Sequence, residues 1–208
     1  MTVPGRIEAA FLLRSLDPPD WLVRHSRAVA EVAAFLVART ALRGVPVDRR
    51  LAESAALLHD VDKALPSADP LRDLPHGRGS AAWLAEHGHP ELGPPVETHP
   101  VTRLLDGAWF DTWIARSRPE QRIVAYADKR AGQRLESLDA RFASWRRRYP
   151  RLDVEGRTVG WDDAVVEDLR RRVDRLEAHV CEAAGVRADE IRRLPWTAAA
   201  LRAAGRER

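Results

Sequence analysis

Cysteine is almost absent from this chain, which has a single one, Cys181, among 208 residues. A lone cysteine cannot form a disulfide within its own chain, and it has no neighbouring thiolates with which to build a cysteine zinc site. Any metal ion would therefore need nitrogen and oxygen ligands.

Long apolar runs are missing as well. No stretch approaches the roughly 20 residues that a membrane-spanning helix needs. The first ten residues also lack the basic start and apolar middle of a signal peptide. We therefore expect a cytoplasmic protein that does not associate with a membrane.

Lysine is scarce, because only Lys63 and Lys129 accompany thirty-two arginines. Lys63 follows Asp60 by three positions, and Lys129 comes directly after Asp128. An ammonium group is a compact point charge that suits a phosphate oxygen. Both lysines are therefore candidate phosphate ligands, with chance placement as the alternative.

A strong excess of charge is missing too, since the formal net charge is only +3. Basic clusters at 146–148 and 170–172 alternate with acidic residues along helical stretches, which is typical of solvated helix faces. Nucleic-acid or nucleotide binding is the alternative role for these clusters. We expect that nucleic acid is not the partner.

Helical periodicity dominates the chain and predicts an all-α protein. Asp20 and Asp48 are expected to cap the first two long helices. The predicted helices cover residues 20–42, 48–60, 79–87, a short stretch near 99, 119–131, 135–148, 161–184 and 188–208, with a loop at 64–75 and a linker at 150–160. We expect a domain at 1–149 and a helical extension at 150–208 that packs on it through Val165, Leu169, Val173, Leu176 and Val180.

His25 falls on the apolar face of the first long helix, three residues after Leu22 and four before Val29. Residues at this spacing share one face of a helix, so the imidazole is expected to point inward. An inward histidine is either a hydrogen-bonded core residue or a metal ligand, and this helix alone does not decide between them.

His59 and Asp60 end the second helix, which is rich in alanine and leucine. Adjacent residues lie about 100° apart around a helix, so both can reach one ion only near the helix end. An exposed helix terminus is the alternative. There the histidine would suit the helix dipole but the aspartate would not.

Asp128 follows Val124 by four residues in a third apolar segment. A buried carboxylate needs compensation by a cation, because an unpaired buried charge is too costly. An arginine partner and a metal ion are the two candidates.

Together the three helices bring two imidazoles and two carboxylates to the interior, a set that suits Fe, Mn, Co, Ni, Zn or Mg. His25, the segment from Leu57 to Lys63 and the segment from Tyr126 to Lys129 resemble the HD-domain phosphohydrolase superfamily. The resemblance implies a helical bundle. It also implies metal ligands at His25, His59, Asp60 and Asp128, with Lys63 next to the substrate phosphate.

Two further histidines extend this resemblance. His76 in a Gly- and Ser-containing segment and His99 after Glu97-Thr98 are similar to the extra ligands of HD proteins that hold two metal ions. The resemblance is nearest to the small bacterial group that includes symmetrical diadenosine-tetraphosphate hydrolases. It implies two divalent ions, with Asp60 between them.

The function that this resemblance implies is hydrolysis of a phosphoester or phosphoanhydride bond in a small nucleotide-like substrate by metal-activated water. Asp60 and Lys63 would be catalytic. Phosphate contacts are predicted at Lys63, Arg103, Lys129 and Arg130. A non-catalytic nucleotide-binding or regulatory module and a purely structural bundle are the alternatives, and a homo-oligomer stays open.

Overall fold

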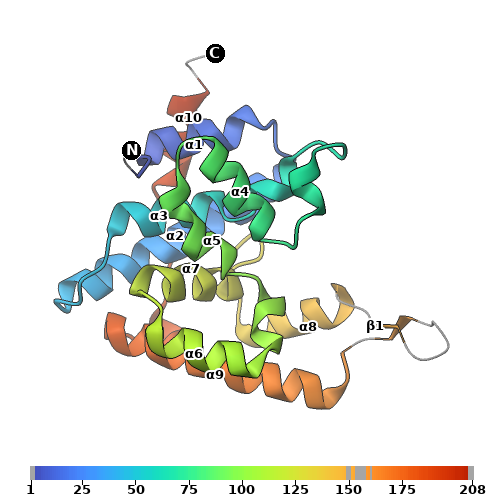
Figure 1. Cartoon of the computed structure of the whole chain (residues 1–208). Helices are drawn as coiled ribbons and strands as arrows, with labels where there is room; N and C mark the ends of the chain where they lie inside the picture. Colours follow the sequence, from blue (N-terminus) through green and yellow to red (C-terminus); the bar gives the residue numbers. More distant parts are fainter. Residues whose placement is uncertain (1–2, 149–150, 153–157, 160, 206–208) are drawn as a thin grey trace.

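The computed structural model describes residues 3–148, 151–152, 158–159 and 161–205. These residues form a helical protein, and the all-α prediction is confirmed (Figure 1). The α-helices are α1 (Arg6–Ser15), α2 (Asp20–Leu42), α3 (Arg49–Leu58), α4 (Arg78–Glu86), α5 (Gly93–Glu97), α6 (Gly107–Arg116), α7 (Pro119–Arg130), α8 (Leu138–Arg148), α9 (Asp163–Ala184) and α10 (Thr197–Ala204). Short 3₁₀ helices cover Val61–Ala64, Pro70–Asp73, Pro90–Leu92, Val101–Leu105 and Ala188–Glu190.

The structure differs from the sequence prediction at the start of α2 and the end of α3. Asp20 is the first residue of α2, whereas Pro19 is the cap and has no side chain that could accept a hydrogen bond. Asp48 caps α3 as predicted, because its side chain accepts from the amide of Leu51. The predicted end at residue 60 is wrong, since α3 ends at Leu58 and Asp60 has left helical geometry.

Two helices, α1 and α6, were not predicted from the sequence. The N-terminus of α6 carries a recognisable signal, because the Asp106 side chain accepts a hydrogen bond from the amide of Trp109. A short antiparallel pair, β1 (Arg151–Leu152) with β2 (Thr158–Val159), lies in the segment predicted as a linker.

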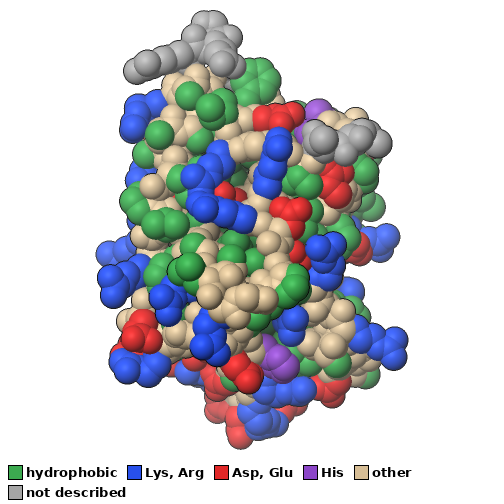
Figure 2. Space-filling view, turned by 90° about the vertical axis from the view of Figure 1, so that its left-hand side faces the viewer, with side chains coloured by type: hydrophobic (Ala, Val, Ile, Leu, Met, Phe, Trp, Pro, Cys, Tyr) green, Lys and Arg blue, Asp and Glu red, His purple; other side chains and the backbone are tan. Residues whose placement is uncertain are grey.

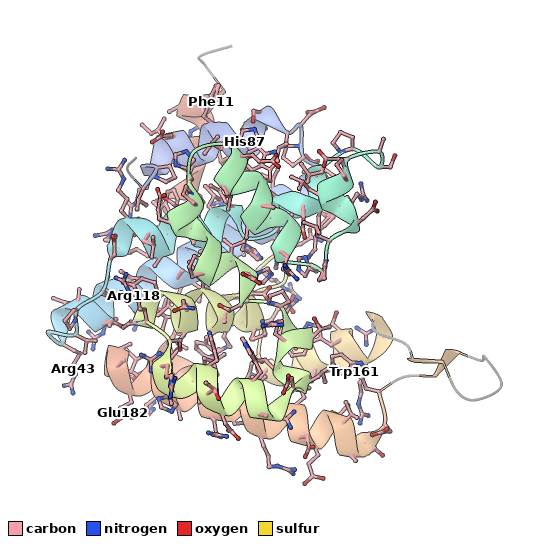
Figure 3. The ribbon with its side chains drawn as sticks, in the orientation of Figure 1. Phe11, Arg43, His87, Arg118, Trp161 and Glu182 are labelled. Atoms are coloured by element: carbon pink, nitrogen blue, oxygen red, sulfur yellow. The ribbon has the colours of Figure 1, made fainter. Side chains whose placement is uncertain are left out.

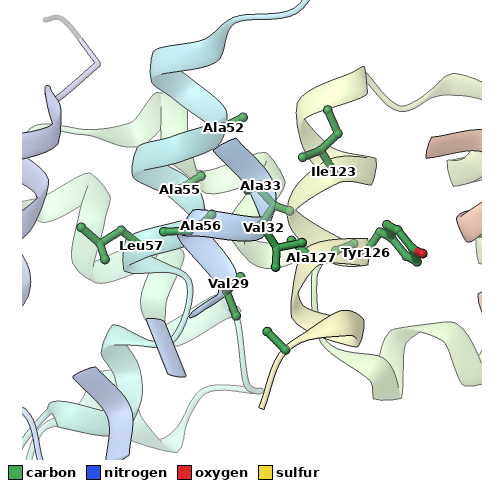
Figure 4. Packing of buried hydrophobic residues seen from close by; sticks show 14 of the residues in the cluster. Val29, Val32, Ala33, Ala52, Ala55, Ala56, Leu57, Ile123, Tyr126 and Ala127 are labelled. Atoms are coloured by element: carbon green, nitrogen blue, oxygen red, sulfur yellow. The ribbon is translucent and has the colours of Figure 1, made fainter. Parts of the chain in front are cut away.

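The core that positions the site is the meeting of α2, α3 and α7, each of which contacts the other two. Small side chains dominate where they meet, among them Ala33, Ala52, Ala55 and Ala127 (Figure 4). Small residues at a contact bring helix axes closer together. Polar side chains at the ends of these helices can therefore approach one another closely.

The C-terminal helices pack on this core. In Figure 1, α9 (orange) runs beside α6 along one side of the molecule, and it also contacts α2 and α7. Its predicted apolar stripe faces inward, since four of its five members are buried and Val165 is half-buried. Helix α10 packs on α1. The division of the chain at residues 149 and 150 stays a prediction.

Within the part of the chain that is described, no helix combines the length and the apolar character that crossing a bilayer requires.

Candidate metal centre

Six side chains predicted as metal ligands gather at one place in the interior. His25 comes from α2, Asp128 from the last turn of α7, and the His59-Asp60 pair from the turn after α3. His76 and His99 come from the segments before α4 and after α5. Five of the six are buried, and His76 is partly exposed.

Three of the four histidines donate their Nδ1–H to a main-chain carbonyl. The distances are 2.8 Å from His25 to Gly132, 2.8 Å from His59 to Ala56, and 2.5 Å from His99 to Val96. A carbonyl oxygen only accepts, so Nδ1 must carry the proton and Nε2 of the neutral ring carries a lone pair. The backbone thereby fixes which nitrogen each ring presents to the interior.

The Nε2 atoms face one another in two pairs. His25 and His59 bring theirs to 3.1 Å, and His76 and His99 bring theirs to 3.2 Å. Two lone pairs at this distance repel unless a proton or a metal cation lies between them. Each pair is therefore a place where a cation is stabilised.

Asp60 lies between the two pairs. Its Oδ2 is 3.2 Å from Nε2 of His25 and 3.5 Å from Nε2 of His59. Its Oδ1 is 3.1 Å from Nε2 of His76 and 3.4 Å from Nε2 of His99. Oδ1 is buried without a hydrogen-bond partner. One carboxylate thus presents one oxygen to each histidine pair.

Asp128 completes the group around His25 and His59. Its Oδ1 lies 3.4 Å from Nε2 of His25 and 3.8 Å from Nε2 of His59, and its Oδ2 accepts from Lys129 at 2.9 Å. Arg141 also approaches Oδ1, at 3.8 Å. A basic partner for this buried carboxylate is therefore present, and His25 and His59 place beside it two nitrogens that could hold a metal ion.

His76 differs from the other three histidines because its Nδ1 partner is a carboxylate. Asp62 accepts from that nitrogen at 2.8 Å and from the amide of Gly77 at 3.3 Å. A carboxylate partner orients a histidine ligand and makes its other nitrogen more basic. Asp62 was not predicted as part of the site, although it lies two residues from Asp60.

A family model described as the HD domain matches residues 22–132. The chain belongs to the HD-domain family. The match covers the segment that contributes all six predicted ligands. The broader resemblance is thus confirmed, while the narrower one to diadenosine-tetraphosphate hydrolases stays a prediction.

Curated relatives of this HD domain are named Ribonuclease Y. The protein from Chlorobium phaeobacteroides is 29% identical over 174 residues, which is 74% of this chain and 31% of the relative. The proteins from Chlorobium luteolum and Chlorobium phaeovibrioides are 32% and 33% identical over 132 residues, or 57% of this chain and 22% of each relative. The chain thus spans less than a third of these relatives. No solved structure matches it significantly.

The six predicted ligands form a cluster in which burial and the neighbouring carboxylates shift the pKa values of the histidines in different directions. Burial lowers the pKa of His25, but hydrogen bonds and charge from Asp128 and Asp60 outweigh it and raise the pKa to about 9. Against the same cost of burial, Asp60 and Asp62 raise the pKa of His76 to about 9. Burial lowers the pKa of His59 to about 3. The protein without metal therefore holds one extra proton in each pair at neutral pH.

The donor set fits divalent cations. Three groups have ligand atoms within 4.8 Å of one another: His25, His59 and Asp128; His59, Asp60 and His99; and Asp60, Asp62 and His76. Mixed imidazole and carboxylate donors suit Mn, Fe, Co, Ni and Zn. The unpartnered Oδ1 of Asp60 is explained if a cation lies beside it.

A cavity of about 220 Å³ opens beside the cluster. Its lining residues are Trp21, His25, Asp60, Lys63, Gly132, Gln133, Glu136, Arg141 and Ser144. A narrower pocket of about 20 Å³ is lined by His25, Lys63, His76, Pro100, Val101, Asp128, Arg141 and Trp145. Lys63 and Arg141 line both, and the Lys63 ammonium donates to Oδ2 of Asp60 at 2.6 Å.

The other three residues predicted to contact phosphate do not line either space. Arg103 lies over the Trp109 ring at 4.4 Å. The fully buried Lys129 ammonium donates to the carbonyl of His99 and to Asp128, so it links these two ligand-bearing segments. Arg130 donates to Tyr126 and to main-chain carbonyls. Their phosphate role stays a prediction that these positions do not support.

The remaining histidines lie away from the cluster. His87 stacks on Trp83 at the outer end of α4 (Figure 3). His89 is buried in the turn that follows α4, and His179 is exposed on α9. Cys181 is in the same tail helix. None of these side chains lines the two spaces beside the site.

We expect metal binding to release about two protons at pH 7, because a cation needs the Nε2 lone pairs of His25 and His76, which are protonated in the protein without metal. The release should decline as pH rises through about 9. Calorimetry in buffers of different ionisation enthalpy measures it. His76→Gln should remove about one of these protons and His87→Gln none. Metal binding at pH 7 without proton release would contradict the charge distribution described.

Proposed function

We propose that this HD domain is a metal-dependent phosphohydrolase that cleaves a phosphoester or phosphoanhydride bond of a nucleotide-like substrate. The observation that carries the proposal is the position of Asp60. Its two oxygens face two separate histidine pairs next to an open cavity.

In this proposal Asp60 would be shared between two divalent ions. His25, His59 and Asp128 would hold one ion, and His76 and His99 the other, which accounts for all six predicted ligands. Divalent ions supply Lewis acidity, which activates water for attack on phosphorus and neutralises phosphate charge. Asp62 orients His76 for this role through its hydrogen bond to Nδ1.

Lys63 is the residue of the cluster best placed to act on both the carboxylate and the substrate. Its ammonium pairs with Asp60, and its side chain, 32% exposed, lines the cavity. The charge of Asp60 raises the pKa of Lys63 against the cost of burial, so the ammonium stays protonated. Lys63 therefore supplies a fixed positive charge next to the expected position of the phosphate.

The nucleotide part of the proposal is supported by Trp21. This side chain is 42% exposed, yet it lines the cavity one helical turn before His25. An exposed indole that lines a polar cavity offers a face on which a nucleobase can stack. A cavity of about 220 Å³ has room for a phosphate and part of a sugar beside it.

RNA is the second candidate substrate, because the curated relatives are named ribonucleases. The arginines of α9 offer little free positive charge for binding the RNA backbone. Arg170 pairs with Asp139 and Asp174, and Arg171 with Glu167 and Asp168, as the sequence predicted for solvated faces. On the face seen in Figure 2, basic side chains are interspersed with acidic and hydrophobic ones.

Metal removal tests the proposal directly. Protein stripped with a chelator should lose phosphohydrolase activity across a panel of nucleotides, dinucleoside polyphosphates and short RNAs, and should regain it with Mn²⁺. Asp60→Asn should lower kcat/KM by at least about a hundredfold, because Asp60 is a proposed direct ligand and even the loss of an outer-shell partner costs up to about that much. His87→Gln, remote from the site, is the control. Tight nucleotide binding without turnover of any substrate would favour the non-catalytic module instead.

Trp21→Ala tests the substrate class. It should raise KM about tenfold for a nucleotide, because loss of a base–aromatic stack costs roughly 1–3 kcal/mol. KM for an aliphatic phosphoester such as glycerol phosphate should not change, and Trp21→Phe should keep most of the nucleotide affinity. Equal effects of Trp21→Ala on both substrates would show that the indole does not contact a base.

A further inference from the structure

We infer that Arg141, a residue of α8, binds the phosphoryl group of the substrate next to the metal cluster. This inference rests on the proposed function, in that it takes the substrate to carry a phosphate. It adds a binding residue that the sequence analysis did not select and that lies outside the residues matched by the family model, 22–132.

Arg141 is buried but its hydrogen-bonding capacity is largely unused. The residue is 5% exposed. Its Nη2 donates to the main-chain carbonyl of Asp128 at 3.2 Å, and its buried Nε has no hydrogen-bond partner. A guanidinium carries five N–H donors, and leaving buried donors unsatisfied costs free energy. A ligand that accepts hydrogen bonds would recover that cost.

The position of Arg141 indicates that this ligand would be a phosphate group. It lines both the cavity of about 220 Å³ and the narrower pocket next to His25, His76 and Asp128. A group held here lies within reach of both the predicted ligands and the open cavity. Because the guanidinium is planar and always charged, it matches two oxygens of a phosphate.

The surroundings of Arg141 hold its side chain in place, although only its Nη2 donates a hydrogen bond, to the carbonyl of Asp128. The guanidinium carbon lies 5.3 Å from the centre of the Trp145 ring, one turn further along α8. The distance of 3.8 Å to Oδ1 of Asp128 is too long for a hydrogen bond but keeps the two charges in attraction. A cation fixed in this way loses little entropy when it binds an anion.

Two other cations near the cluster donate to groups of the site itself. Lys129 is used by His99 and Asp128, and Lys63 donates to Asp60. Arg141 is the arginine that lines both spaces beside the cluster, among the residues that the structure describes. It therefore complements Lys63 as a second positive group around the expected phosphate.

The competing explanation is that Arg141 only neutralises Asp128. The two roles predict different results when Arg141 is replaced. A neutralising residue would change metal binding first, whereas a phosphate-binding residue would change the affinity for phosphate with the metal still in place.

The experiment uses the full chain loaded with Mn²⁺ and titrated with inorganic phosphate by calorimetry, with the Mn content measured on the same samples. Arg141→Gln should weaken phosphate binding about tenfold or more, since it removes charge-assisted hydrogen bonds. Arg141→Lys, which keeps the charge but not the planar fork, should show an intermediate affinity. Arg147→Gln, exposed on the same helix, is the matched control and should bind phosphate like the unmodified protein.

Three results would overturn the inference. One is phosphate affinity unchanged in Arg141→Gln. Another is a loss of phosphate affinity that is accompanied by an equal loss of Mn. The third is failure of the loaded, unmodified protein to bind phosphate at all. If that protein binds phosphate through Arg141 but hydrolyses no substrate, the proposed catalytic function fails and the phosphate-binding role of Arg141 stands.

Discussion

The buried carboxylate of Asp60 is the group on which the rest of the site depends. A buried carboxylate must be compensated by positive charge. Lys63 compensates Oδ2, while Oδ1 is left without a hydrogen bond. The histidines around it have their Nδ1 protons fixed by the backbone or by Asp62, so each turns Nε2 towards the carboxylate. A carboxylate and four converging Nε2 atoms define a place for cations, either protons or metal ions.

Periodicity alone predicted the parts of this site that lie on long helices. His25 shares the buried face of Leu22 and Val29, and Asp128 shares that of Val124. These positions follow from sequence because helix geometry fixes which residues share a face. The all-α class followed from the same periodicity. His59 and Asp60 were correctly expected near a helix end, although α3 ends earlier than predicted.

Helical spacing alone did not predict the other residues of the site. His76 and His99 lie in segments between helices, where no period constrains side-chain direction, and only the family resemblance indicated them. Asp62 matters through a hydrogen bond to a residue fourteen positions away. Arg141 could have been found, because it shares the buried face of α8 with Leu138 and Trp145, the same argument that found His25.

The central proposal is that Asp60 would bridge two divalent ions, and anomalous X-ray diffraction from crystals grown with Mn²⁺ tests it most directly. The account predicts two peaks about 3.5–4 Å apart. One should lie among His25, His59, Asp128 and Oδ2 of Asp60, and the other among His76, His99 and Oδ1 of Asp60. A cluster with no anomalous peak, or with one peak that leaves Oδ1 of Asp60 without a cation, would contradict it.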